Sequence, residues 1–200
     1  MRLIGCVIIS LLCCFHGNAQ EKAIILKNVN VVDVVEGSIR KGQDVVIKEG
    51  IIQAVGKGAG TGVSGEVKDL TGMYVMPGLI DAHVHIANDP KESQADRAKH
   101  LEYFLRHGVT SIRDAAGDAR VLLELKEGVQ QGKYLGPDIY YAAFMAGPAY
   151  FEGNDREKSM VEGWPEPYAP WMQCIRPDSD LDKAMEDAKE WGCTGVKIYG

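Results

Sequence analysis

Two histidines separated by one residue, His83 and His85, are the leading candidates for chemistry in the sequence. Side chains two positions apart on a strand point to the same face, so these imidazoles would project together while Ala82 and Val84 face the other way. Two imidazoles on one face can hold one metal ion. Such a pair is weak evidence by itself, so the surrounding sequence has to decide its role.

A lysine near the end of the sequence, Lys197, is the second candidate. In the alternating segment around it, Val196 and Ile198 would pack outward on helices, which turns Lys197 and Tyr199 inward. A buried ammonium group is unfavourable unless it is paired or loses its charge. A neutral lysine amine can react with carbon dioxide to give a carbamate that bridges two metal ions. The alternative is a lysine at a strand end that reaches water or a carboxylate.

Alternating strands and helices after Pro77 would position these groups. Apolar runs and helical periodicity predict strands at 78–85, 109–113, 138–145 and 195–199, and helices at about 92–107, 118–131 and 179–191. Strands joined in this order by helices pair in parallel, and the α/β pattern is typical of a (β/α)8 barrel, which keeps its catalytic groups at the C-terminal strand ends.

The length indicates that only half of such a barrel is present. Residues 78–200 number 123, and a closed barrel takes about 250. We therefore expect the sequence to be the N-terminal part of a longer protein of roughly 400 residues or more. The alternative is a half-barrel that associates with a second copy. Residues 20–77 contain short β-branched runs, at 24–35, 44–48, 51–55 and 67–70, which predict a small antiparallel sheet or β-sandwich.

The first 19 residues are typical of a signal peptide. A short basic start and an apolar run from Leu3 to Phe15 precede the small residues Gly17 and Ala19. Cleavage after Ala19 predicts an exported protein, periplasmic or secreted, with no stable membrane span. Lipid anchoring is the weaker interpretation, because a lipoprotein signal would have a small residue immediately before its cysteine, whereas Leu12 precedes Cys13 and Cys13 precedes Cys14. In an oxidising compartment Cys174 and Cys193 could pair, or they could be two free thiols.

The charge balance argues against one class of partner. The sequence has 22 Lys and Arg against 28 Asp and Glu, a formal net charge of −6. Nucleic-acid binding requires clustered basic residues that release counterions from phosphates. We therefore expect no nucleic acid among the partners of this protein.

The segment from Tyr74 to His85, with the sequence YVMPGLIDAHVH, resembles the signature of the amidohydrolase superfamily of metal-dependent hydrolases. In that family it forms the first barrel strand. Residues 51–56 look like the family's N-terminal β-sandwich segment. Residues 108–114 are similar to the second strand of imidazolonepropionase-like and prolidase-like members, and residues 195–199 match the fourth strand of members with a carboxylated lysine.

The resemblance implies a hydrolase of carbon–nitrogen bonds with a binuclear site, most often of zinc. His83 and His85 would bind one ion, and a carboxylated Lys197 would bridge to the second. A hydroxide activated by the metals would attack a small-molecule substrate that contains an amide, a short peptide or a cyclic amide. In the family, two histidines after strands five and six and an aspartate after strand eight complete the site. No matching positions lie within residues 1–200, so the resemblance implies that this part of the protein is inactive alone.

Two other functions stay open. One is a mononuclear deaminase-like or imidazolonepropionase-like hydrolase in which Lys197 is structural, and the other is a secreted binding protein without catalysis. The segment from Met145 to Ala149 departs from the Gly-Gly-His-Gly run common in prolidase-like relatives, which puts peptide specificity in doubt. The proline- and aromatic-rich residues 147–178 would form either a lid or a buried surface excursion.

Four further residues are candidates for contacts with the ligands or the substrate. Asp81 shares the face of the histidine pair, and it would be either a hydrogen-bond partner of that pair or a polar strand residue. Arg113 and Asp114 end the second strand, where they would either reach substrate or tie loops. Tyr199 follows Lys197 on the same face.

Overall fold

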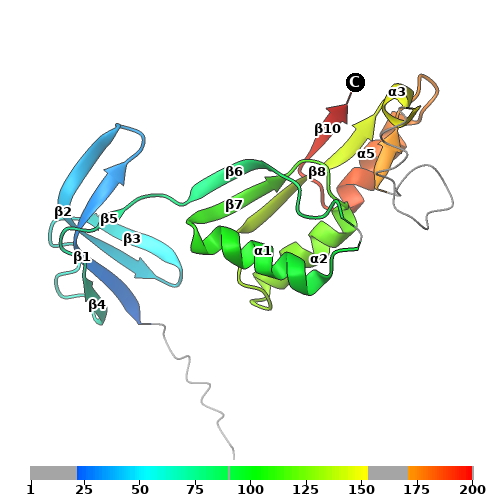
Figure 1. Cartoon of the computed structure of the whole chain (residues 1–200). Coiled ribbons are helices and arrows are strands. Elements are labelled where there is room, and N and C mark those ends of the chain that lie inside the picture. The colour runs from blue at the N-terminus through cyan, green and yellow to red at the C-terminus, as the bar shows by residue number, and fades with distance from the viewer. Residues whose placement is uncertain (1–21, 90, 153–170, 200) are drawn as a thin grey trace, which may run out of the picture. The chain divides into compact units, whose positions relative to one another are not determined.

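The computed structural model describes residues 22–89, 91–152 and 171–199, which divide into two units between Pro77 and Gly78 (Figure 1). The predicted signal peptide, residues 1–19, lies outside these ranges. Within them, no helix is both long enough and apolar enough to cross a membrane.

The first unit is built on one five-stranded sheet. Its strands are β1 (Ala23–Asp33), β2 (Ser38–Lys48), β3 (Ile51–Gly56), β4 (Gly65–Asp69) and β5 (Tyr74–Val75). The order is β3-β2-β1-β4, and β5 pairs with β1. β1, β2 and β3 pair antiparallel, whereas β4 and β5 run parallel to β1. The described strands therefore form a single mixed sheet where the sequence predicted an antiparallel sheet or sandwich.

A buried carboxylate holds the loop that produces the mixed order. The connection 57–64 carries the chain from β3 to the opposite edge of β1, so β4 enters parallel to β1. Asp44 is 5% exposed, and its two oxygens accept hydrogen bonds from the backbone N–H groups of Asn28 (3.3 Å) and Gly60 (3.2 Å). This contact holds the crossing loop against the sheet.

The second unit alternates strands and helices. Its elements are β6 (Leu79–Val84), α1 (Gln94–Arg106), β7 (Val109–Asp114), α2 (Ala119–Gln130), β8 (Asp138–Ala146), α3 (Pro148–Glu152), β9 (Met172–Cys174), α5 (Leu181–Glu190) and β10 (Gly195–Tyr199). The sheet order is β10-β8-β7-β6, with β9 beside β8, and every pairing is parallel. The predicted order of strands, the three longer helices and the parallel pairing are confirmed.

The three longer helices begin where a polar side chain accepts a backbone hydrogen bond. Ser93 Oγ accepts from Asp96 N at 3.2 Å, Asp118 Oδ1 from Arg120 N at 3.0 Å, and Asp180 Oδ1 from Lys183 N at 3.0 Å. Each bond satisfies an N–H group that has no partner within the helix. The helices therefore start one or two residues later than the apolar periodicity predicted.

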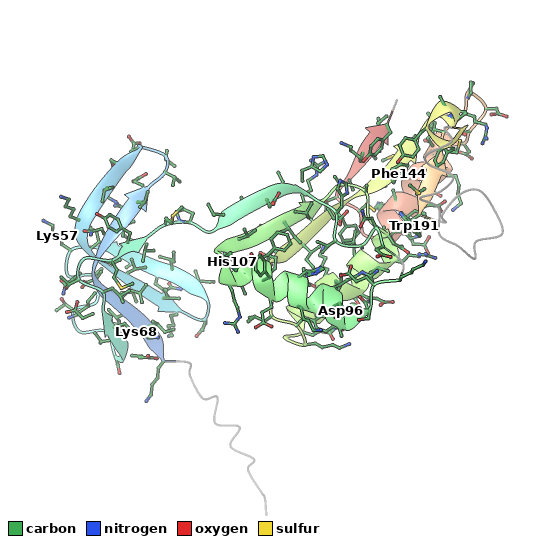
Figure 2. All side chains as sticks on the ribbon, viewed as in Figure 1. Lys57, Lys68, Asp96, His107, Phe144 and Trp191 are labelled. Carbon is green, nitrogen blue, oxygen red and sulfur yellow. The ribbon has the colours of Figure 1, made fainter. Side chains whose placement is uncertain are left out.

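The alternation of β8 separates two faces of this sheet. Tyr141 packs in a core with Leu101 of α1 and Leu122 of α2, and Met145 packs near Ala188 of α5. Phe144 lies on the opposite face (Figure 2), in a cluster with aromatic residues of α3 and β10. Figure 1 shows α1 and α2 on the same side of the sheet. The face that carries Phe144 is the one that would line a barrel.

Candidate metal centre at the strand ends

The histidine pair lies at the C-terminal end of β6. Val84 is 8% exposed and packs in the core with Ile86 and Ala87. His83 and His85 alternate with these core residues along the chain, so they face the other way. His83 and His85 are both exposed. Their ring centres are 5.1 Å apart, with an angle of 69° between the ring planes. The structure therefore brings the two predicted rings together.

The ring separation fits two imidazoles on one ion. With zinc–nitrogen bonds of about 2.0–2.1 Å and tetrahedral angles, the two ring centres would lie about 5 Å apart. Edge-to-face ring pairs span a range of about 4.5–7 Å, so the separation also fits a direct contact between the rings. Within the described residues, no group of three or more His, Cys, Asp and Glu side chains could hold a metal ion. By itself the pair would thus be an incomplete set of metal ligands.

Lys197 lies on the face of β10 that points away from the helices. Its neighbour Val196 packs near Ala188 of α5, and Tyr199 belongs to the aromatic cluster on the opposite face. Lys197 Nζ lies 5.1 Å from the centre of the Tyr199 ring. The inward direction of Lys197 and Tyr199 agrees with the sequence pattern. Ile198 does not pack on a helix as expected, because its side chain is 75% exposed and no described helix covers it.

Two strands separate Lys197 from the histidine pair. β7 and β8 lie between β6 and β10, so three strand spacings correspond to about 14 Å along a flat sheet. Lys197 is in register with Phe144 of β8. The structure thus places the three predicted ligands at strand ends of one sheet, and it brings together only the two imidazoles.

Asp114, at the end of β7, is completely buried and binds backbone. Its Oδ2 accepts a hydrogen bond from Ile86 N at 2.6 Å, and its Oδ1 accepts bonds from Ala116 N at 3.0 Å and Gly117 N at 2.6 Å. Of the two predicted roles, the structure gives Asp114 the tying of loops. Arg113 is exposed, and among the described residues it forms no hydrogen bond with His83 or His85.

Backbone hydrogen bonds join the same two loops on either side of this carboxylate. Ala115 N donates to Val84 O at 3.0 Å, and Asp118 N donates to Ala87 O at 2.9 Å. The backbone of Gly117 lies close to the Asp114 carboxylate, because a Cβ atom at this position would be 2.9 Å from Asp114 Oδ1. The residues on both sides of His85 are therefore held against the loop that follows β7.

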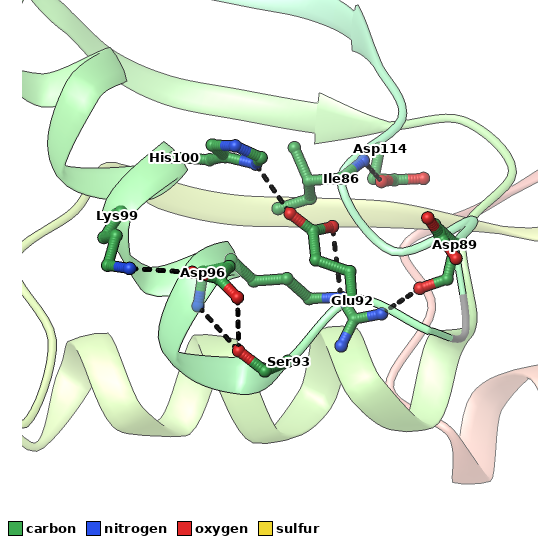
Figure 3. Close-up of polar contacts among 9 residues, drawn as sticks. Ile86, Asp89, Glu92, Ser93, Asp96, Lys99, His100 and Asp114 are labelled. Carbon is green, nitrogen blue, oxygen red and sulfur yellow. Dashed lines mark hydrogen bonds and ion pairs between the residues drawn. The ribbon is translucent and has the colours of Figure 1, made fainter.

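A second polar cluster, centred on the buried Arg97, holds the far end of the loop after β6 (Figure 3). Arg97 of α1 is 4% exposed, and its guanidinium donates a hydrogen bond to the carbonyl oxygen of Asp89. Arg97 Nε lies 3.7 Å from Glu92 Oε2, and His100 Nδ1 lies 3.1 Å from Glu92 Oε1. Sequence reasoning missed this cluster. One feature of the sequence could have indicated it. Arg97 lies four positions before Leu101, which places a charged residue on the buried face of the helix.

Asp81 does not contact the imidazoles as a hydrogen-bond partner. Its Oδ1 accepts a bond from the backbone N–H of His83 at 3.2 Å. Of the two predicted roles, this contact fits that of a polar strand residue, because Asp81 binds the main chain two residues ahead, a local pattern common for aspartate.

The described aromatic residues after β8 are packed inward. The Phe144 ring stacks on Tyr199 with centres 4.8 Å apart, and the Tyr150 ring lies 5.1 Å from Phe144 and 5.0 Å from Tyr199. Phe151 and Trp171 are 5% and 6% exposed. These rings agree with a buried excursion. The predicted lid depends largely on residues 153–170, which lie outside the described part of the chain.

The two cysteines of the second unit do not form a disulfide. Cys174 and Cys193 are both free. Cys174 packs with Phe144 and Ala146 on one face of the sheet, whereas Cys193 packs with Ala143 and neighbouring residues on the helix-covered face. The sheet lies between the two thiols. Of the two predicted alternatives, the structure therefore has two free thiols and not a disulfide.

Comparison with known proteins finds a matching family model and several relatives of this chain. Residues 74–194 match the model of the Amidohydrolase family. A dihydroorotase of Trichlorobacter lovleyi is 35% identical over 89 residues, which are 44% of this chain and 21% of the relative. An adenine deaminase of Thermosipho melanesiensis is 28% identical over 152 residues, which are 71% of this chain and 25% of the relative.

A solved structure shares the fold. A prolidase in complex with N-methylphosphonate-L-proline gives a TM-score of 0.68 at 23% identity, over 88% of this chain and 46% of that chain. The α/β fold and parallel sheet thus resemble part of a larger barrel protein. The chain spans 21% and 25% of the lengths of the two curated relatives described above.

Proposed function

The chain belongs to the amidohydrolase family, and on this premise we propose that the protein is a metal-dependent hydrolase of a carbon–nitrogen bond. The dihydroorotase and adenine deaminase relatives support the bond type. The proposed substrate is a small molecule with an amide, short peptide or cyclic amide group. In the overall reaction, the oxygen of water bonds to the attacked carbon, the carbon–nitrogen bond breaks, and the leaving nitrogen takes up a proton.

The observation that carries this proposal is the separation of 5.1 Å between the His83 and His85 rings at the end of β6. Both rings are exposed on the face opposite the helix-packed core, so their nitrogen atoms are accessible to a divalent cation. When bound, such a cation supplies Lewis acidity and lowers the pKa of a coordinated water. His83 and His85 would hold it, and the main-chain bonds around them would keep both rings in place.

Lys197 would take part through a carbamate. In that reaction the neutral amine nitrogen bonds to the carbon of carbon dioxide and a proton is released. The face of an aromatic ring attracts a cation and repels an anion, and Lys197 Nζ lies 5.1 Å from the Tyr199 ring centre. A carboxylated Lys197 would therefore turn away from Tyr199, toward the interior of the barrel and a second ion.

A mononuclear site is the second candidate, and a specific observation favours it. Lys197 contacts Tyr199 as a cation would, and two strands separate it from the histidines. In this case Lys197 positions the aromatic cluster, and His83 and His85 hold the only ion of this part of the site.

Metal counting on the intact protein separates these possibilities. Bound metal is measured by mass spectrometry for the wild type, Lys197→Ala and His83→Ala, with exposed Lys189→Ala as the matched lysine control. Two ions that fall to one or none in Lys197→Ala support the binuclear site, as does a carbamate signal from labelled bicarbonate. One ion, unchanged in Lys197→Ala and lost in His83→Ala, supports the mononuclear site.

The same variants test the hydrolase itself. We expect the wild type to release an amine or ammonia from at least one amide, dipeptide or cyclic amide in a substrate panel, and His83→Ala to be inactive on it. A wild type that binds no metal and cleaves none of these compounds would contradict the proposal and favour a binding protein. Export is proposed from the sequence alone, and mass analysis of the mature N-terminus tests it.

A further inference from the structure

We propose that Asp114 is a positioning residue for His85. β6 ends at Val84, so His85 lies just beyond the last strand position that pairs with β7. Strand pairing does not hold His85, and another contact has to do so. The buried carboxylate of Asp114 supplies it, because its Oδ2 accepts a hydrogen bond of 2.6 Å from the backbone N–H of Ile86, the residue that follows (Figure 3).

The peptide unit that Asp114 binds is the one that joins His85 to Ile86. Because that unit is planar, fixing the Ile86 N–H also fixes the carbonyl group of His85. The backbone bonds at Val84 O and Ala87 O hold the chain on either side. The direction of the Cα–Cβ bond of His85 is therefore set by a residue at the end of the neighbouring strand, which lies 28 positions after Ile86 in the sequence.

Burial makes this contact strong and specific. Asp114 is 0% exposed, so water does not compete for its oxygens, and hydrogen bonds to a charged acceptor are shorter and stronger than neutral ones. The carboxylate uses one oxygen for the loop after β6 and the other for Ala116 and Gly117 of the loop after β7. One side chain thus joins the two loops.

The chemistry of the carboxylate allows a selective substitution. In Asp114→Asn, the amide oxygen can keep the two bonds to Ala116 and Gly117, which places the amide NH2 against the Ile86 N–H. Two donors cannot bond to each other, so this orientation releases Ile86. The opposite orientation would lose two bonds to keep one. Asp118→Asn is the matched control, because Asp118 is also buried (7% exposed) but its side chain binds Arg120 and not the loop after β6.

The first test is independent of metal. In the intact wild type, amide hydrogen exchange and nuclear Overhauser effects report the Ile86 N–H bond and the contact between the His83 and His85 rings. We expect Asp114→Asn to lose exchange protection at Ile86 and the contact between the rings, and Asp118→Asn to keep both. Retained protection and an unchanged ring contact in Asp114→Asn would overturn the proposal.

The second test rests on the proposed function. Zinc affinity, measured by competition with a chelator, should fall about 10–100-fold in Asp114→Asn, the usual loss when a group that orients a ligand is removed. Asp118→Asn should bind zinc as the wild type does. Equal affinity in all three proteins would contradict a positioning role. A wild type that binds no zinc defeats the proposed function alone, since the exchange and ring measurements still decide the position of His85.

A further variant covers the case in which Asp114→Asn does not fold. Gly117→Ala keeps the carboxylate but places a Cβ atom within 2.9 Å of Asp114 Oδ1 and 3.0 Å of Ala87 Cβ. The carboxylate must then shift, and protection at Ile86 should fall in this variant too. Full protection at Ile86 in a folded Gly117→Ala protein would count against the proposal.

Discussion

The ammonium group of Lys197 lies 5.1 Å from the centre of the Tyr199 ring, two residues further along the same strand. The ring also stacks on Phe144 of the neighbouring strand, at 4.8 Å. Lys197 is therefore held beside an aromatic cluster on the face that would line a barrel.

Replacing Tyr199 with Leu should lower the free energy of unfolding by about 1–2 kcal/mol. The substitution removes ring contacts with Phe144 and Tyr150, and each such pair contributes about 0.5–1.5 kcal/mol. Tyr199→Phe keeps the rings and should lose less. Urea unfolding measures both, with Ile198→Ala as a control at a position that is 75% exposed. A loss in Tyr199→Leu no larger than in this control would refute the packing role.

The unfolding free energy should fall as the pH rises above about 9. Burial raises the pKa of the Cys193 thiol from 9.0 to about 11, so the unfolded chain loses this proton at lower pH than the folded protein does. The unfolded state therefore binds fewer protons between these values, and stability decreases with pH. Burial, followed by the charges of Cys193 and Glu127, raises the pKa of Tyr141 from 10.0 to about 12, which extends the decrease.

Urea unfolding between pH 7 and 11 measures this slope. Cys193→Ala should show a shallower decrease between pH 9 and 11, because the group that titrates is gone. The thiol should also react slowly with iodoacetamide at pH 8, since the thiolate is the reactive form. Equal slopes in the wild type and the variant would show that Cys193 titrates normally.

Gly128 in α2 should respond to substitution with opposite signs in two backgrounds. A Cβ atom at this position would lie 2.4 Å from Tyr134 Cδ2, so Gly128→Ala in the wild type forces the ring to move and should destabilise the protein by about 1–3 kcal/mol. In Tyr134→Ala the clash is absent, and the better helix propensity of alanine should then stabilise by up to about 1 kcal/mol. A double-mutant cycle in urea measures the coupling, and additive effects would contradict it.

The order of elements in the second unit and the faces of their side chains were predictable from the sequence. Alternation along Val196, Lys197 and Tyr199 is a local property, because successive side chains on a strand point to opposite faces. The same rule placed the imidazoles of His83 and His85 on one side of β6. Helix periodicity likewise located α1, α2 and α5 to within about two residues at most ends.

Contacts between distant residues were decided only by the tertiary structure. A carboxylate at position 114 carries no local sign that it binds the N–H of Ile86, and the same holds for Arg97 and the Asp89 carbonyl. β4 and β5 pair parallel with β1 because the chain crosses to the other edge of that strand. The alternation of apolar and polar residues along a strand does not encode which edge the chain reaches. Periodicity reports the direction of a side chain relative to its own backbone. Its partner depends on how separate elements pack, and that is settled by the whole fold.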